Sequence, residues 1–206
     1  MRPDPTELIE RAAALAAPGR RRLLGICGSP AAGKSTLAET IVAALGDAAV
    51  CVPMDGFHLA QVELDRLGRA DRKGAPDTFD GAGYVALLRR LRTPVRDEVV
   101  YAPAFRREIE EPVAGAVPVA PHVPLVITEG NYLLVDTAPW DQVAGLLDEV
   151  WFLRVPARLR RDRLIARHRE FGRSAEQARE RALGSDERNA ELIESTAHRA
   201  HLIVQD

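Results

Sequence analysis

The stretch Gly28-Ser29-Pro30-Ala31-Ala32-Gly33-Lys34-Ser35 decides the fold of this chain. A continuous apolar run at residues 23–27 precedes it, and a helix-forming segment at residues 34–45 follows it. The two glycines let the backbone wrap around a phosphate group, while the lysine and serine that end the stretch supply a point charge and a hydroxyl. Strand, glycine-rich loop and helix in this order are typical of the Walker A phosphate-binding loop.

Each residue of this loop has an expected role in binding a nucleotide. The backbone N–H groups and the N-terminus of the following helix hold the phosphates, Lys34 reaches the β- and γ-phosphate oxygens, and the hydroxyl of Ser35 binds Mg²⁺. ATP and Mg²⁺ are therefore the expected cofactors. The expected nucleotide-binding residues of the loop are Gly28, Ser29, Pro30, Ala31, Ala32, Gly33, Lys34, Ser35 and Thr36.

Lysine is rare in this chain. Of its 28 lysine and arginine residues, only Lys34 and Lys73 are lysine. A lysine is a compact point charge that can enter a tight phosphate cradle, so these two positions are candidates for a specific need for an ammonium group. The Asn-Lys-x-Asp signature of guanine-binding proteins does not occur in the sequence, which argues against a GTPase.

Length and composition predict one globular domain over residues 1–206. Hydrophobic residues make up 46% and charged residues 28% of the chain, and the formal net charge is −2. This charge provides no general field for nucleic acid or for an anionic membrane surface, so neither is an expected partner. No signal peptide and no run of 18 apolar residues is present, which predicts a cytoplasmic protein. Both a monomer and a homodimer stay open.

Apolar runs alternate with helix-forming segments along the chain. Near-continuous apolar strands between helices predict a five-stranded parallel sheet sandwiched by helices, the α/β fold of the P-loop NTPases. A helix within residues 1–19 opens the chain, and Asp80 is the expected N-cap of a helix at residues 84–91. The expected strands are at residues 23–27, 49–54, 125–128, 150–155 and 202–204, with a hairpin or flap at residues 99–105 and 113–119 and an almost wholly helical segment at residues 158–198.

Two acids are expected at the ligand-binding edge of this sheet. Asp55 follows the second strand, and ligands bind at the carboxyl ends of strands in open α/β sheets. Transfer of a phosphoryl group to an alcohol needs a carboxylate to accept the proton, so Asp55 is the candidate catalytic base and can also reach Mg²⁺ through water. Glu129 closes the strand at residues 125–128, which suits a magnesium ligand. An ordinary turn residue at Asp55 and an ordinary strand-end acid at Glu129 are the alternatives.

Four motifs carry a resemblance to a known family. They are the loop at residues 28–35, Met54-Asp55-Gly56-Phe57-His58, Arg72-Lys73-Gly74-Ala75-Pro76-Asp77-Thr78-Phe79-Asp80, and Thr128-Glu129-Gly130-Asn131-Tyr132-Leu133-Leu134. From residue 23 onward the chain resembles the phosphoribulokinase, uridine kinase and bacterial pantothenate kinase group of P-loop kinases. The resemblance implies that Asp55 is the catalytic base and that Glu129 helps to hold Mg²⁺. The chain looks most similar to compact bacterial kinases described as nucleoside/nucleotide kinase-like or fructokinase-like.

The resemblance places residues 72–80 on the side of the phosphate acceptor. A basic rim there predicts a small hydroxyl acceptor that also carries a carboxylate or phosphate. For Arg106 and Arg107, which neighbour several glutamates, a solvated charge cluster is the alternative. The Tyr-Asp-Phe motif of uridine kinases is replaced here by residues 101–105, which lack the acid, and this departure argues against nucleoside recognition. The acceptor classes that stay open are nucleosides, pantothenate-like compounds and sugar-type compounds. The expected acceptor-binding residues are His58, Arg72, Lys73, Asp77, Phe79, Tyr101, Arg106 and Asn131.

An arginine-rich lid is expected at residues 158–175. Arginines above the triphosphate would neutralise charge on the transferring phosphoryl group and exclude water. Arg163 and Arg167 match the Arg-x-x-x-Arg stretch of related kinases and are the candidate catalytic pair, with Arg173 as a third nucleotide contact. Arg158 and Arg161 are expected to pair on the helix surface with Asp162 or Glu170.

Asn189 is a candidate adenine contact, because residues 186–190 resemble the segment near the adenine in these kinases; a plain helix-surface position is the alternative.

The sequence as a whole predicts an ATP-dependent kinase that phosphorylates a hydroxyl group of a small metabolite. Two other functions stay open. One is an ATP-binding regulatory module without an acceptor, and the other is a nucleotide kinase with a phosphate acceptor.

Overall fold

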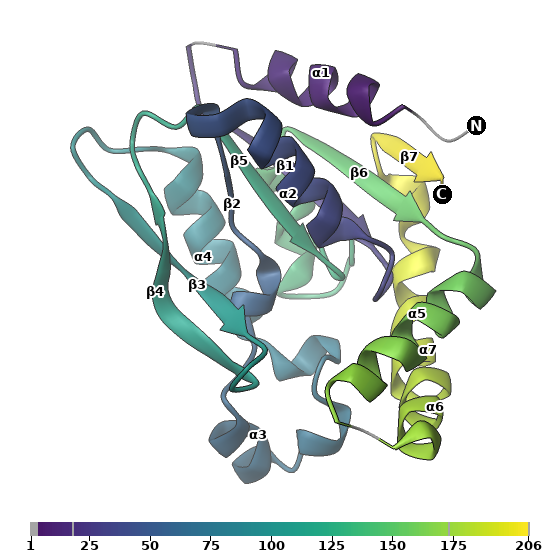
Figure 1. Cartoon of the computed structure of the whole chain (residues 1–206). Helices are drawn as coiled ribbons and strands as arrows, with labels where there is room; N and C mark the ends of the chain where they lie inside the picture. The colour runs from purple at the N-terminus through teal and green to yellow at the C-terminus, as the bar shows by residue number, and fades with distance from the viewer. Residues whose placement is uncertain (1–3, 18, 173, 206) are drawn as a thin grey trace.

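A parallel five-stranded sheet forms the centre of the protein, in the computed structural model that describes residues 4–17, 19–172 and 174–205 (Figure 1). The strand order is β2-β5-β1-β6-β7. The strands are β1 (Arg22–Gly28), β2 (Ala49–Cys51), β5 (Leu125–Gly130), β6 (Glu149–Arg154) and β7 (Leu202–Gln205). All of β5 is buried, as expected for a strand covered on both faces. The predicted α/β fold is confirmed.

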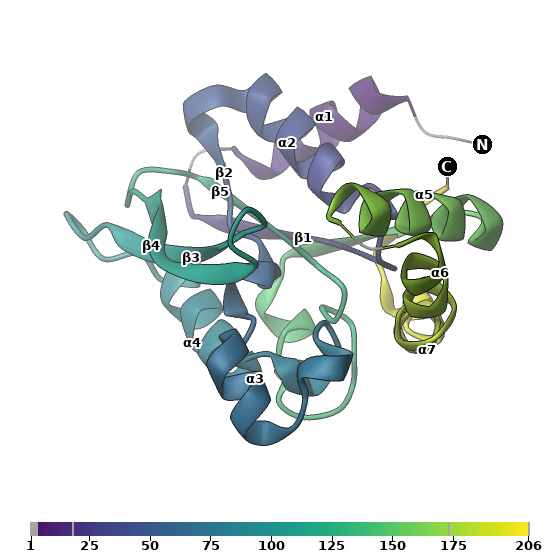
Figure 2. The same ribbon diagram turned by 60° about the horizontal axis from the view of Figure 1, so that its bottom comes forward.

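Helices cover both faces of this sheet (Figures 1 and 2). On one face, α1 (Pro5–Leu15) and α2 (Lys34–Leu45) bury Leu8 and Ile41 against the sheet. On the other face lie α4 (Gly81–Arg92), α7 (Ser185–Ser195) and a separate hairpin of β3 (Val100–Arg106) and β4 (Glu111–Val119). Within the described part of the chain, no helix has the length and apolar character needed to cross a membrane.

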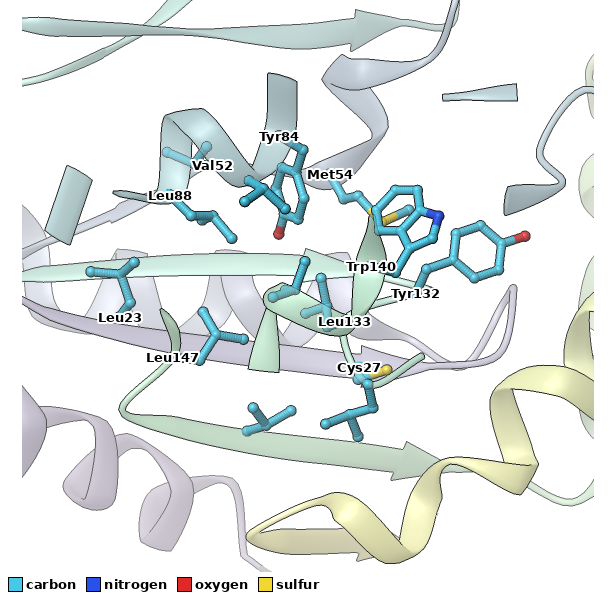
Figure 3. Close-up of a cluster of buried hydrophobic side chains, with 14 of the residues drawn as sticks. Leu23, Cys27, Val52, Met54, Tyr84, Leu88, Tyr132, Leu133, Trp140 and Leu147 are labelled. Atoms are coloured by element: carbon cyan, nitrogen blue, oxygen red, sulfur yellow. The ribbon is translucent and has the colours of Figure 1, made fainter. Parts of the chain in front are cut away.

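A buried cluster beneath α4 fixes the two strand ends that carry the acids (Figure 3). Tyr84, fully buried, lies next to Thr128, whose hydroxyl is 2.6 Å from the phenol oxygen and donates to the carbonyl of Val52 at 2.7 Å. Because the Thr128 proton is used in that bond, Tyr84 is the donor to Thr128. Burying an aromatic side chain of this size stabilises the fold by about 2–3 kcal/mol. The pair therefore ties β5 to the segment that follows β2.

The strand predicted at residues 49–54 is shorter in the structure. β2 ends at Cys51, and a 3₁₀ turn follows at Met54–Phe57. Pro53 has no N–H group to continue the ladder, which explains why the strand stops. Asp55 consequently lies on a tight turn, and Gly130 of β5 lets this turn approach closely, since a Cβ atom at Gly130 would lie 2.5 Å from the Cβ of Met54.

The helical segment predicted at residues 158–198 consists of three helices, and one of its expected ion pairs is wrong. The helices are α5 (Ala157–Glu170), α6 (Ala175–Leu183) and α7, and we refer to α5 and α6 as the lid. Arg161 was expected to pair within α5, yet its guanidinium donates to Glu187 of α7 at 2.7 and 3.1 Å. The helices pack side by side, so the stronger bidentate partner lies across the bundle. A short helix α3 (Gln61–Leu67) was not predicted.

Candidate active site

A cleft of about 1550 Å³ opens at the carboxyl ends of β1 and β5. The phosphate loop forms its floor, the lid forms one wall, and the tip of the β3–β4 hairpin together with residues 55–79 forms the other. Figure 2 shows the lid helices and the hairpin on opposite sides of the sheet edge. This is the edge at which α/β proteins bind their ligands.

The phosphate loop has the backbone geometry that its glycines predicted. Gly28 has φ 155°, and a Cβ atom there would lie 2.6 Å from the carbonyl oxygen of Leu153. Gly33, at φ 93°, precedes the first turn of α2. Only glycine accepts such positions without strain. The loop therefore presents its N–H groups and the start of α2 to the cleft.

Lys34 is buried at the centre of the floor. Its ammonium group donates to the carbonyls of Gly28 at 2.9 Å and Ser29 at 3.1 Å, and to Oδ1 of Asn131 at 2.7 Å. Burial lowers the pKa of Lys34, while the carboxylate of Glu129 opposes that shift. Asn131, an expected acceptor-binding residue, thus contacts the phosphate-loop lysine, and its role toward the acceptor stays a prediction.

Two side chains with oxygen atoms that can bind a metal ion lie close to this lysine. The hydroxyl of Ser35, which is exposed to the cleft, donates to Oε1 of Glu129 at 2.9 Å. Burial raises the pKa of Glu129, and the negative charge of Asp55 raises it further. A cation between these acids would relieve that repulsion. Hydroxyl and carboxylate oxygens are ligands that Mg²⁺ prefers, and Mg²⁺ commonly binds through one or two carboxylates plus the phosphates of its nucleotide. The residues present therefore fit Mg²⁺.

Asp55 faces a cationic wall made by the hairpin and the lid. Nη2 of Arg107 lies 3.7 Å from Oδ2 of Asp55. The guanidinium of Arg107 also lies 5.9 Å from the ring centres of Phe105 and of Phe171, the residue that follows α5. Burial, together with repulsion from Arg107, lowers the pKa of Arg167 on α5. Arg107, for which the sequence left a solvated cluster open, therefore contacts the candidate base.

The acceptor end of the cleft combines aromatic rings with a lysine. The His58 ring lies 4.0 Å from the ring centre of Phe79 and 4.8 Å from that of Phe105. Its Nδ1 lies 2.8 Å from the carbonyl of Asp55, so Nδ1–H donates there, and burial lowers the pKa of His58. Lys73 donates to the carbonyl of Glu110 at 2.7 Å. A neutral imidazole and an ammonium group thus share this end.

The structure brings together most, but not all, of the predicted site residues. Arg72 and Asp77 pair with each other at 2.6 Å outside the cleft lining, and Tyr101 is 60% exposed on the hairpin, also outside it. Arg173 lies outside the described residues. The predicted residues that line the cleft are Pro30, Ala31, Ala32, Gly33, Lys34, Ser35, Thr36, Asp55, His58, Lys73, Phe79, Arg106, Glu129, Asn131, Arg163, Arg167 and Asn189.

Asn189, the candidate adenine contact, is a buried residue of α7 rather than a helix-surface residue. Its Nδ2 is 3.4 Å from the carbonyl of Gly74, in the loop on the acceptor side. Another part of the cleft lining consists of apolar side chains of α1, α2 and β7 and of the residue that follows β6. They are Pro5, Leu8, Leu37, Val155 and Val204. An apolar slot of this kind suits a nucleotide base.

Two residues of the site carried no local sequence signal. Glu194 of α7 accepts a hydrogen bond from the hydroxyl of Ser29 at 3.1 Å, across 165 residues of chain. Arg181 of α6 lines the cleft and donates to backbone carbonyls of residues 71 and 73. Both lie on helix faces rich in similar charged residues, where nothing but the packing of the helices distinguishes them.

Comparison with known proteins places these elements in one family. The model of the Phosphoribulokinase / Uridine kinase family matches residues 23–206. A protein of Schizosaccharomyces pombe, provisionally named a uridine kinase, is 35% identical over 97% of this chain and 89% of its own length. An ATP-dependent kinase-like protein of Aspergillus versicolor is 37% identical over 68% of this chain and 86% of its own.

A solved structure agrees with this placement. A protein of a Silicibacter species, provisionally described as a fructose transport system kinase, is 36% identical to this chain and has a TM-score of 0.88. The match covers 98% of this chain and 98% of that protein. The family match includes the phosphate loop, both acids and the lid. The chain therefore belongs to the phosphoribulokinase/uridine kinase family, and it is an ATP-dependent kinase.

Proposed function

We propose that this kinase transfers the γ-phosphoryl group of MgATP to a hydroxyl group of a small anionic metabolite, with Asp55 as the general base. The observation that carries the proposal is the convergence of Lys34, Glu129 and Asp55 on one cleft from three different elements. A carboxylate at the end of the second strand, next to the phosphate loop, can accept the proton of an acceptor hydroxyl. A phosphate acceptor would need no such base.

Ser35 and Glu129 are the proposed ligands of Mg²⁺, with Asp55 reaching it through water. Mg²⁺ held by these residues would supply positive charge against the negative charge that develops on the phosphate oxygens. Lys34 contributes a fixed positive charge at the β- and γ-phosphates. Arg163 and Arg167 line the lid wall, from which they can neutralise the transferring group and exclude water.

The acceptor class follows from the opposite wall. Lys73, Arg106 and Arg107 supply cationic groups there, and the rings of Phe79 and Phe105 supply apolar faces. A carboxylate or phosphate on the acceptor would form charge-assisted hydrogen bonds with these cations. Hydroxy acids, sugar phosphates and pantothenate-like compounds combine a hydroxyl with such an anion, and they come first in a test.

The test measures ADP release by the purified protein with ATP and Mg²⁺ against a panel of hydroxy acids, pantothenate, sugars, sugar phosphates, nucleosides and nucleoside monophosphates. We expect acceptor-dependent ADP release that is lost in Asp55→Ala. Asp136→Ala is the matched control, because Asp136 is exposed and outside the cleft lining. Turnover only with a nucleoside monophosphate, retained in Asp55→Ala, would show a nucleotide kinase and overturn the proposal.

A further inference from the structure

The segment between α3 and α4 is held from several sides. We call residues 70–78 the acceptor loop; it contains two 3₁₀ turns, Ala70–Arg72 and Pro76–Thr78. The carbonyl of Gly74 accepts from the hydroxyl of Tyr132 at 2.5 Å and from Nδ2 of Asn189 at 3.4 Å. Figure 2 shows this segment extending from α3 towards the side on which α6 and α7 lie. The loop therefore contacts both the segment that follows β5 and helix α7, which lies beside the lid.

Arg181 connects the lid directly to this loop. Its Nη1 donates to the carbonyl of Asp71 and its Nη2 to the carbonyl of Lys73, each at 2.5 Å. The helix that carries it is anchored by the buried side chains Ala178 and Ala182. Both bonds are charge-assisted, and they fit the planar fork of a guanidinium. A displacement of α6 therefore displaces these two carbonyls or breaks two strong hydrogen bonds.

Lys73 links the same loop to the hairpin on the acceptor side. Its carbonyl accepts from Arg181, whereas its ammonium group donates to the carbonyl of Glu110 at 2.7 Å and to Oε1 of Gln61 at 3.3 Å. The ammonium also lies 5.4 Å from the ring centre of Phe105. The backbone of Lys73 is thus hydrogen-bonded to the lid while its side chain lines the cleft.

We propose that Arg181 is a positioning residue that couples the lid to the acceptor loop, so that nucleotide binding under the lid sets the position of Lys73 for the acceptor. The inference rests on the proposed function for its acceptor side, and on the two hydrogen bonds of Arg181 for the coupling. Coupling of this kind needs one element that both ligands move, and the pair of α6 and the acceptor loop is such an element.

The test follows amide hydrogen exchange of peptides covering residues 68–79, with and without Mg²⁺ and the non-hydrolysable analogue AMP-PNP. In the native protein we expect the analogue to slow exchange in the acceptor loop as well as in α2. Arg181→Ala should lose most of the slowing in the acceptor loop while keeping it in α2. Arg181→Lys should recover only part, because one ammonium group cannot reproduce the two-pronged contact.

Arg179→Ala is the matched control, because Arg179 is an exposed residue of the same helix. It should behave as the native protein. A purely structural role would speed exchange in the loop in both states and leave the effect of AMP-PNP intact. That outcome, or an acceptor loop in the native protein that does not respond to AMP-PNP, would overturn the proposal. Hydrogen exchange requires no turnover, so a failure of this coupling can be distinguished from a failure of the proposed reaction.

Discussion

The hydroxyl of Ser35 lies 2.9 Å from Oε1 of Glu129, although 94 residues separate them in the chain. Ser35 lies in the first turn of α2, and Glu129 is next to last in β5. The register of β1 against β5 places Ile26 beside Glu129, two residues before the phosphate loop begins. The parallel pairing of these two strands therefore builds the candidate magnesium site.

Removing the oxygen ligand of either Ser35 or Glu129 should weaken magnesium binding. We expect Ser35→Ala and Glu129→Gln each to raise the Mg²⁺ concentration that gives half-maximal kinase activity by roughly tenfold to a hundredfold. A magnesium titration at saturating ATP measures this. An unchanged titration curve in Glu129→Gln would show that Glu129 is not a ligand of the ion. Glu39 is an exposed acid of α2, so the control Glu39→Gln should leave the magnesium titration unchanged.

Asp55→Asn should separate chemistry from binding. The amide has the shape of the carboxylate but cannot accept a proton, so kcat should fall by about 10²- to 10⁴-fold. Affinity for ATP, measured by isothermal titration calorimetry, should change little because the phosphate loop is intact. A variant with nearly native kcat would show that another group takes the proton.

Lys34→Arg should be almost inactive despite conserving the charge. The ammonium group is enclosed by three oxygens at 2.7–3.1 Å, and a guanidinium is too wide for that position. We expect a loss of about 10²-fold or more in kcat/KM for ATP. Steady-state kinetics over a range of ATP concentrations measure it, with Arg169→Lys as an exposed counterpart on α5. Substantial activity in Lys34→Arg would contradict the tight cradle.

Glu187 should make stability depend on pH. Hydrogen bonds from Arg161 and Arg160 lower the pKa of Glu187 to about 2, from an ordinary value of 4.5. Its contribution is therefore complete above pH 4.5 and is lost as the pH falls towards 2. Arg160 is 4% exposed, so Glu187→Gln leaves a buried charge without its partner and should cost about 3 kcal/mol at pH 7.

Thermal unfolding midpoints at several pH values check this effect. Glu187→Gln should unfold about 6–12 °C below the native protein at pH 7, and the gap should narrow below pH 4.5. Glu180→Gln, at an exposed position of α6, should stay close to the native midpoint. A constant gap across the pH range would mean that the carboxylate charge of Glu187 is not the source of the stabilisation.

The sheet and the phosphate loop could be predicted because their signals are local. An apolar strand, a Gly-rich turn and Lys34-Ser35 lie within residues 23–35, and parallel strands place Glu129 and the residues after β2 at the same edge. The error at β2 was also local, since Pro53 ends the strand earlier than its apolar run indicated. The position of Asp55 on the turn does not depend on that boundary.

The walls of the cleft could not be predicted because they depend on how distant helices pack. Arg161 has acids one residue and nine residues away in its own helix, yet it bonds to Glu187 across the helix pair. Asn189 lies in a segment that resembles the adenine-binding segment of related kinases, yet its side chain contacts the carbonyl of Gly74. Nothing in the residues around these side chains encodes which neighbouring helix they meet, because that choice is made by the packing of α5, α6 and α7.

The scarcity of lysine has a practical consequence for labelling. Both side-chain amines of the chain line the cleft, and Lys34 is only 8% exposed whereas Lys73 is half-buried. An amine-selective reagent thus has one accessible side-chain target, which lies beside the proposed acceptor. Mass spectrometry of the fraction acylated at Lys73 can therefore report occupancy of that wall by any candidate metabolite, with no engineered tag and no coupled enzyme assay.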